Sequence, residues 1–444
     1  MIDMSPALVT IIMLVGLIVT IMSGFPLAMP IGTVGLVVGF LAYGPSVFDQ
    51  IYHSVFAILH DYVLLALPLF VFMGVVLEFS LIADKMYDAL FLLLSGFRGG
   101  LALVTLVLGT ILAACVGVVT ASVTMLTAVA LPAMVKRGYN RSLASGVICA
   151  GGTLGILIPP SVMLVIYGPM ARVSIGRLFF GAMGPGLLLS SLYIIYVICA
   201  CHFKPELAPT IPPEERAVPL SRKLRLVFGS LVPPAFIILS VLGVIYMGIA
   251  PPTEAAAVGS FAALVLTVVY RRLTWKTLID ILRRALNISA VVMFIGAASV
   301  AFTSVFLKAG GGKVVQEAVL ATPGGRWGVF FVVMLIYFIL GFFIEWLGIF
   351  FIMVPILAPI APILGFDPIW FGIMICVNLQ TSFLTPPYAF AIFVLRGVAP
   401  PELGVTSSDI IRGVWPFVIL IVVGMALCIA FPEIILWLPG KMIK

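Results

Sequence analysis

Two interrupted apolar segments carry the side chains whose types and spacing suit ion chemistry. They are GGTLGILIPPS at 151–161 and NLQTSFLTPPY at 378–388, and each lies inside a long apolar run. The pairs Pro159-Pro160 and Pro386-Pro387 remove backbone donors and push the preceding residue out of the helical region, so neither run can be one continuous helix. Hydrocarbon tolerates unpaired backbone only where that backbone lines a cavity or is buried in protein. A matched pair of interrupted helices therefore predicts the binding site of a transporter.

Neutral polar side chains gather at both interruptions. They are Thr153, Ser161, Gln380, Thr381, Ser382 and Thr385. Hard monovalent cations prefer oxygen ligands, and freed helix N-termini attract an anionic group such as a carboxylate. Taken singly, each hydroxyl could bond back to its own helix. Taken together on two breaks, they indicate a site for Na⁺ and an organic anion.

Two further apolar runs, 101–135 and 327–362, could each be two spans or one re-entrant hairpin. Basic residues favour the hairpin, because Arg98 precedes the first run and Lys136 and Arg137 follow it. Arms of about 16–18 residues are also marginal for a full crossing. The centres of the runs carry Gly117, Thr120, Ser122, Thr124, Glu345 and Gly348. A hairpin tip against a helix break predicts one Na⁺ site in each half of the chain.

Glu345 is an acidic residue at the centre of an apolar run. A carboxyl group at such depth is costly and usually faces a cavity, an ion or a partner. Two interpretations stay open: a hydrogen-bonded packing residue, or a group that coordinates or supports a cation. Glu254 lies near the start of a predicted span, where helix capping is the simpler explanation.

The composition defines a polytopic α-helical membrane protein. Of its 444 residues, 63% are hydrophobic and 9% are charged, and the mean hydropathy is +1.29. The apolar runs are too long for barrel strands of about 10 residues. The net charge of +7 fits positively charged inner loops and predicts no nucleic-acid partner.

Enzyme chemistry is not predicted. The six cysteines form no CxxC pair, so metal sites other than those for sodium are not expected. The three histidines lie near segment ends, which leaves an intramembrane nucleophile without a base. No nucleotide-binding glycine loop occurs, so coupling would come from an ion gradient.

The chain divides into two halves and a linker. Residues 1–203 form a first repeat, residues 204–227 a cytoplasmic linker, and residues 228–444 a second repeat. The expected spans of the first half are 7–23, 26–43, 62–80, the broken helix 142–169, and 183–202, with an amphipathic interfacial helix at 45–61. Those of the second half are 228–248, 253–270, 286–307, the broken helix 369–395, and 411–435.

The halves match at an offset of 227 positions, which places Pro159-Pro160 on Pro386-Pro387. About five crossings in each repeat make the two repeats inverted. With the N-terminus outside, 17 of the 24 basic residues fall on inner segments and 7 on outer ones. This bias predicts that both termini lie on the outer, non-cytoplasmic side of the membrane.

Several motifs resemble the large membrane subunit of the tripartite ATP-independent periplasmic (TRAP) transporters. They are AGGTLGILIPPSVMLVIYG at 150–168, VSIGRLFFGAMGPGLLL at 173–189, PPTEAAAVGS at 251–260 and NLQTSFLTPPYAFAIF at 378–393. The resemblance implies an elevator-type fold of the ion transporter superfamily, in a bacterial inner membrane. It also implies Na⁺-driven import of an organic acid delivered by a periplasmic binding protein. A small four-helix membrane subunit would be a separate partner chain.

The resemblance also assigns site residues by position. The implied sodium ligands are Thr120, Ser122, Gly152, Thr153, Gly155, Glu345, Trp346, Gly348, Thr381, Ser382 and Thr385. The implied substrate contacts are Ser122, Thr124, Thr153, Pro159, Asn378, Gln380 and Pro386. The alternative function is a stand-alone Na⁺- or H⁺-coupled organic-anion carrier of similar fold, which needs no binding protein.

Overall fold

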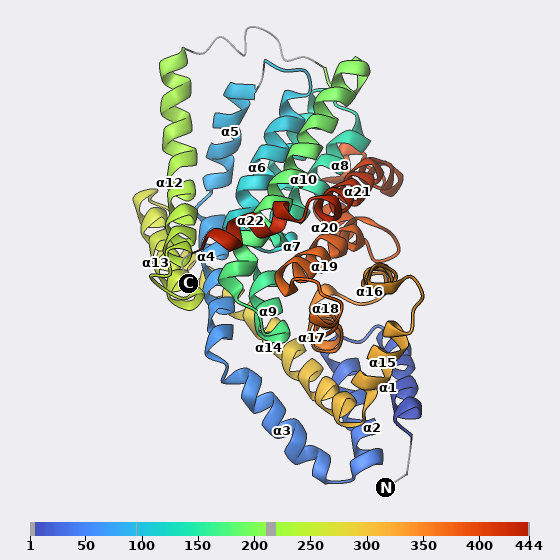
Figure 1. Cartoon of the computed structure of the whole chain (residues 1–444). Coiled ribbons are helices and arrows are strands. Elements are labelled where there is room, and N and C mark those ends of the chain that lie inside the picture. The colour runs from blue at the N-terminus through green and yellow to red at the C-terminus, as the bar shows by residue number, and fades with distance from the viewer. Residues whose placement is uncertain (1–4, 95, 210–218, 443–444) are drawn as a thin grey trace.

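The computed structural model describes residues 5–94, 96–209 and 219–442, and over these ranges the chain is helical with no strand (Figure 1). The helices of the first half are α1 (Pro6–Ile21), α2 (Ala28–Tyr43), α3 (Ser46–Leu59), η1 (Tyr62–Leu65), α4 (Ala66–Phe79), α5 (Ile82–Leu94), α6 (Gly100–Val116), α7 (Val119–Lys136), α8 (Arg141–Thr153), η2 (Leu154–Ile156), α9 (Val162–Ala171), α10 (Ile175–Phe203) and η3 (Pro205–Leu207). Residues 210–218 of the expected linker lie outside the described residues.

The second half repeats this order. Its helices are α12 (Leu220–Tyr246), α13 (Pro252–Val269), α14 (Trp275–Lys308), α15 (Gly311–Leu320), α16 (Gly325–Leu340), α17 (Trp346–Leu357), α18 (Ile360–Ile363), α19 (Pro368–Leu384), α20 (Phe390–Val398), η4 (Pro401–Leu403), α21 (Ser407–Ala430) and α22 (Glu433–Lys441). The first residues of α7 and α17 are 227 positions apart, as are those of α8 and α19. The offset seen in the sequence therefore relates whole elements.

The repeats differ in one segment, which is α3, η1 and α4 in the first half and α14 in the second. In the first half, the chain bends at His60 and Asp61 between α3 and η1, where the Asp61 carboxylate caps the new turn by accepting from Val63 N–H at 2.9 Å. In the second half, α14 is a single 34-residue helix. The predicted amphipathic helix at 45–61 corresponds to α3 and packs against α14.

Several expected boundaries need correction. The helices α5 and α15 were not predicted, because their acidic and basic side chains keep them below the hydropathy of a span. The helix α14 begins at Trp275 rather than 286, and α10 begins at Ile175 rather than 183. In α14, polar turns precede the apolar stretch and continue the same helix, whereas the added start of α10, IGRLFFGA, is apolar except for Arg177. The expected span 411–435 is two helices, α21 and α22, which meet at Phe431 and Pro432.

Both hairpins and both broken helices are present. The arms of the first hairpin are α6 and α7, and those of the second are α16 and α17. The first broken helix consists of α8, η2 and α9, and the second consists of α19 and α20. Among the described residues, eight helices are long and apolar enough to cross a membrane. The fold is therefore that of a polytopic membrane protein, with hairpins and broken helices repeated in each half.

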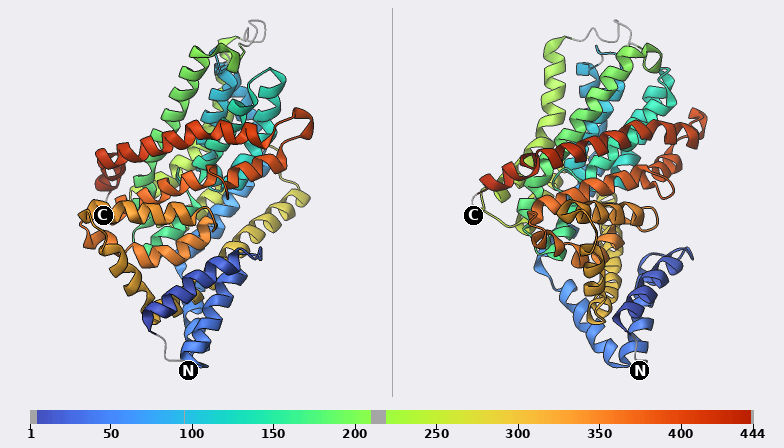
Figure 2. Two further views of the ribbon diagram at one scale, coloured as in Figure 1. Left: turned by 90° about the vertical axis from the view of Figure 1, so that its right-hand side faces the viewer. Right: turned by 45° about the vertical axis from the view of Figure 1, so that its right-hand side comes forward.

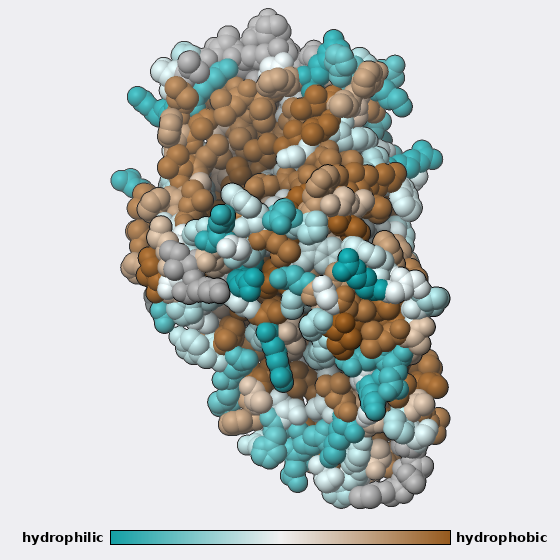
Figure 3. Space-filling view, in the orientation of Figure 1, coloured by the Kyte–Doolittle hydropathy of each residue, from teal (hydrophilic) through white to brown (hydrophobic). Residues whose placement is uncertain are grey.

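The two halves interlock. The α17 arm of the second hairpin packs on α9, and α20 packs on α7 of the first hairpin. The helix α21 crosses α8 (Figure 2), where a Cβ at Gly146 would collide with the Gly413 carbonyl. The outer face is apolar over wide areas (Figure 3), with Phe236 and Phe261 70% and 69% exposed. Such a surface suits contact with lipid.

Candidate functional site

The tip of the first hairpin meets the first helix break. Gly117 ends α6 with φ +65°, and a Cβ there would lie 3.1 Å from the carbonyl oxygen of Pro160. A Cβ at Gly155 would lie 3.0 Å from Ser122 Oγ. Glycine at both positions therefore lets the tip and the break approach closely. Ser122 Oγ is buried and has no hydrogen-bond partner.

The second tip meets the second break in a related way. A Cβ at Gly341 would collide with Ser382 Oγ, which is also buried and unpartnered. The Asn378 amide donates to the Met334 carbonyl at 2.7 Å and so ties α19 to α16. Glu345 is the N-cap of α17 but makes no side-chain capping bond. Its backbone is extended, with φ −61° and ψ 143°, where the second arm of the hairpin begins.

The threonines beside the breaks donate within their own helices. Thr153 bonds to Ala150 O at 3.0 Å, Thr381 to Asn378 O at 2.6 Å, and Thr385 to Thr381 O at 2.6 Å. A hydroxyl that donates in this way keeps lone pairs for a cation. Gln380 is fully buried, and neither polar atom of its amide has a partner. The interpretations of these groups as sodium or substrate contacts stay predictions.

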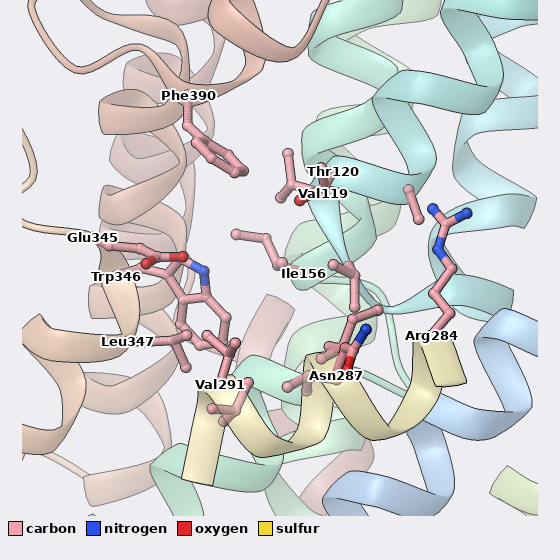
Figure 4. Close-up of a pocket in the computed structure, with 15 residues that line it drawn as sticks. Val119, Thr120, Ile156, Arg284, Asn287, Val291, Glu345, Trp346, Leu347 and Phe390 are labelled. Atoms are coloured by element: carbon pink, nitrogen blue, oxygen red, sulfur yellow. The ribbon is translucent and has the colours of Figure 1, made fainter. Parts of the chain in front are cut away.

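A cavity of about 360 Å³ lies where both tips and α14 converge (Figure 4). Its walls are mainly apolar side chains from these elements. They are Val118, Val119, Thr120, Ala121, Ile156, Val162, Arg284, Asn287, Ile288, Val291, Val292, Glu345, Trp346, Leu347 and Phe390. The cavity therefore joins the first hairpin, the first break, the second tip and α20 around one space, which we call the central cavity.

The polar groups of the central cavity are unevenly placed. Figure 4 shows Glu345 and Trp346 on one side and Arg284 on the opposite side, with Thr120 and Asn287 between them in this view. The cavity thus has an acidic end at the second tip and a cationic end on α14. A guanidinium in a partly desolvated site is suited to planar, bidentate recognition of a carboxylate.

Arg284 and Asn287 were missed as site residues, and Arg284 lies just before the expected span 286–307. They lie in α14, which begins nine residues before Arg284. The α14 residues that line the cavity recur at helical spacing: Arg284, Asn287, Ile288, Val291 and Val292. That i, i+3, i+4, i+7, i+8 stripe, which begins with polar residues, is the signal that could have identified them.

Some predicted site residues lie away from the central cavity. A Cβ at Gly348 would lie 3.0 Å from Leu27 Cδ2, so Gly348 faces α2. Thr124 lines a different cavity. Pro159 is buried, whereas Pro386 is exposed. Of the predicted residues, the structure brings Thr120, Glu345 and Trp346 to the central cavity.

A second cavity, of about 640 Å³, lies beside the central one. It is lined by Glu78, Phe79, Leu81, Ala83, Asp84, Thr124, Met125, Ala128, Val129, Arg271, Arg272, Thr274, Thr277 and Arg284. Arg284 borders both cavities. Its Nη2 lies 3.0 Å from Glu78 Oε1 in an ion pair.

Comparison with a solved structure supports the class of protein that this architecture defines. The Alcanivorax borkumensis YdaH transporter, described as having an unusual topology, aligns with a TM-score of 0.54 at 17% identity. The alignment covers 85% of this chain and 89% of that one. At this identity the likeness concerns the fold alone. The fold is that of a polytopic helical membrane protein.

Sequence comparisons give the family. The family described as "Tripartite ATP-independent periplasmic transporter, DctM component" matches residues 14–434. The C4-dicarboxylate large permease protein DctM of Pseudomonas aeruginosa is 30% identical, over 90% of this chain and 91% of its own. The sialic acid permease SiaM of Vibrio cholerae is 32% identical, over 85% and 86%. The ectoine permease TeaC of Halomonas elongata is 29% identical, over 97% and 98%.

This chain therefore belongs to the family of TRAP transporter large permease subunits. It is a multi-pass membrane transport protein rather than an enzyme. The resemblance stated from the motifs is confirmed.

Proposed function

We propose that this chain is the translocating subunit of a Na⁺-coupled importer of organic acids. One observation carries the proposal: both hairpin tips and both broken helices border one cavity, with Arg284 at one end and Glu345 at the other. Transport needs a site that both repeats can close and open, and a cavity shared by both repeats meets that need.

The acid would bind by its carboxylate to Arg284 and Asn287. Its body would lie against the apolar walls that Val119, Ile156 and Trp346 provide. The named substrates of the relatives include a C4-dicarboxylate and sialic acid, both organic acids. Their range supports organic acids as a class while leaving the particular acid to the binding protein.

Sodium would bind where each tip meets its break. The buried, unpartnered hydroxyls of Ser122 and Ser382 support these two places. A buried hydroxyl without a partner is costly, and an ion coordinated by its oxygen would offset that cost. Thr153 in the first break, and Thr381 and Thr385 in the second, offer further oxygens.

The proposed partners are a periplasmic substrate-binding protein and a small four-helix membrane subunit. The proposed location is a bacterial inner membrane with both termini outside, and the proposed movement is that of an elevator. The alternative, a stand-alone carrier of the same fold, differs in needing no binding protein.

Uptake into proteoliposomes tests the proposal. The vesicles contain this chain and its small partner, and receive a purified binding protein with labelled succinate, lactate, benzoate, sialic acid or ectoine. We expect uptake of an acid that requires both an inward Na⁺ gradient and the binding protein. Uptake unchanged when Na⁺ is replaced by a proton gradient would reject sodium coupling. Uptake without the binding protein would favour the stand-alone carrier.

A further inference from the structure

The ion pair between Glu78 and Arg284 joins the helix α4 to the cavity-lining helix α14. Arg284 Nη2 lies 3.0 Å from Glu78 Oε1, and the two side chains are 41% and 15% exposed, in that order. The second carboxylate oxygen of Glu78 is buried and accepts no hydrogen bond. A buried carboxylate left half satisfied indicates that the pair does more than hold two helices together.

The position of Arg284 connects the pair to the transported acid. Its side chain borders the central cavity and the second cavity, whereas Glu78 borders only the second. A guanidinium has five N–H donors and can contact two carboxylates from different sides. A substrate carboxylate in the central cavity would therefore meet Arg284 while Glu78 holds its other side.

The charged residues around Arg284 would affect how strongly it holds an acid. The other charged residues that line the second cavity are Asp84, Arg271 and Arg272. With Glu78 and Arg284 they give three positive and two negative groups. Among the described residues, Glu78 is the negative group that forms an ion pair with Arg284. Its charge opposes a second carboxylate on the same guanidinium.

We propose that Glu78 is a positioning residue that acts as the internal counter-ion of Arg284. It competes with the transported acid, limits how long the acid stays on Arg284, and retakes the guanidinium as the acid leaves. This inference rests on the proposed function, because it needs an acid that binds Arg284. Glu78 would thus set the balance between tight binding and fast release.

Glu78→Gln tests the inference, because it keeps the shape of the side chain and removes the charge. The acid to use is the one in the panel that the unsubstituted complex takes up fastest. We expect the purified membrane complex with Glu78→Gln to bind this acid about tenfold more tightly in saturating Na⁺, and its maximal uptake rate to fall by a similar factor. A merely structural role would weaken binding or lower the amount of folded protein instead. Glu317→Gln is the matched control, because Glu317 forms an exposed pair with Lys313 at 3.7 Å.

Glu78→Asp is the second variant, because it keeps the charge but draws it back by one methylene. We expect a smaller change in the same direction, with tighter binding and slower turnover. If Glu78→Gln does not fold, this variant decides alone. An unchanged or weaker affinity in the folded variants would overturn the inference and leave the proposed function standing. Failure of the unsubstituted complex to bind or import any panel acid would overturn both.

Discussion

The hydroxyls of Ser122 and Ser382 are two of several buried hydroxyls without a hydrogen-bond partner among the described residues, and each lies where a hairpin meets its break. We expect Ser122→Ala and Ser382→Ala each to raise the half-saturating Na⁺ concentration about fivefold, since the loss of one ligand costs about 1 kcal/mol. Uptake measured against Na⁺ concentration checks this. Ser191→Ala is the control, because that hydroxyl is exposed and bonds only to Leu187 O. Saturation curves that match the unsubstituted chain would place the ions elsewhere.

Arg284 gives a second test at the same scale. Arg284→Gln removes the cationic end of the central cavity and leaves Glu78 without its partner. We expect uptake efficiency, as maximal rate over half-saturation, to fall about 100-fold or more, because a charge-assisted contact to a carboxylate is lost. Arg326→Gln serves as control, since Arg326 lies over the Trp327 ring outside this cavity. An efficiency within about threefold of the unsubstituted chain would mean that the acid binds elsewhere.

The residues show where sequence reasoning succeeds and where it stops. The breaks at Pro159-Pro160 and Pro386-Pro387 were predicted because a proline pair removes backbone donors and disfavours a helix locally. That signal is not sufficient alone, because the pair Pro233-Pro234 lies inside the continuous helix α12. Arg284 could not be assigned to the site in the same way. Its role depends on where the helix α14 lies relative to the two hairpin tips, and that is a tertiary fact. For Gly348, the structure shows only that a Cβ there would meet Leu27, and its assignment as a sodium contact stays a prediction.

At the scale of elements, close backbone crossings hold the broken helices in place. A Cβ at Gly146 would collide with the Gly413 carbonyl, where α8 meets α21. We expect Gly146→Ala to destabilise the protein by about 1–3 kcal/mol through overpacking. Gly229→Ala is the control, because it lies inside α12 with no neighbouring atom within 4 Å, and we expect it to be neutral or slightly stabilising. Thermal unfolding of the detergent-solubilised complex compares them; equal midpoints would contradict the crossing.

Element prediction from the sequence depended on hydropathy. The hairpins and broken helices were predicted because their apolar runs and interruptions are strong signals. The helices α5 and α15 were missed because Asp84, Lys85 and Asp88, and likewise Lys313 and Glu317, interrupt the apolar pattern. Each of the two helices precedes the hairpin of its repeat. Once one of them is known, the offset of 227 positions predicts the other.

At the scale of the whole molecule, the proposed elevator movement would carry the second hairpin past α2. Gly348 faces Leu27, with 3.0 Å between Leu27 Cδ2 and a Cβ at Gly348. We expect the pair Leu27→Cys and Gly348→Cys, once oxidised, to stop uptake, and a reductant to restore it. Each single cysteine variant is the control for loss of packing. Full uptake in the cross-linked protein would show that α2 and the hairpin stay together during transport.

The crossing of α8 and α21 has a thermodynamic consequence. The helix α21 packs on α8, which leads into the first break, and on α19, which leads into the second. A shift of either break would therefore disturb α21, which contacts both α8 and α19. If sodium binds at both breaks as proposed, occupancy of one site would change the free energy of filling the other, and linkage would make that effect equal in both directions. The uptake rate should accordingly rise sigmoidally with Na⁺ concentration. A chain with only one of the two proposed sites filled should transport slowly.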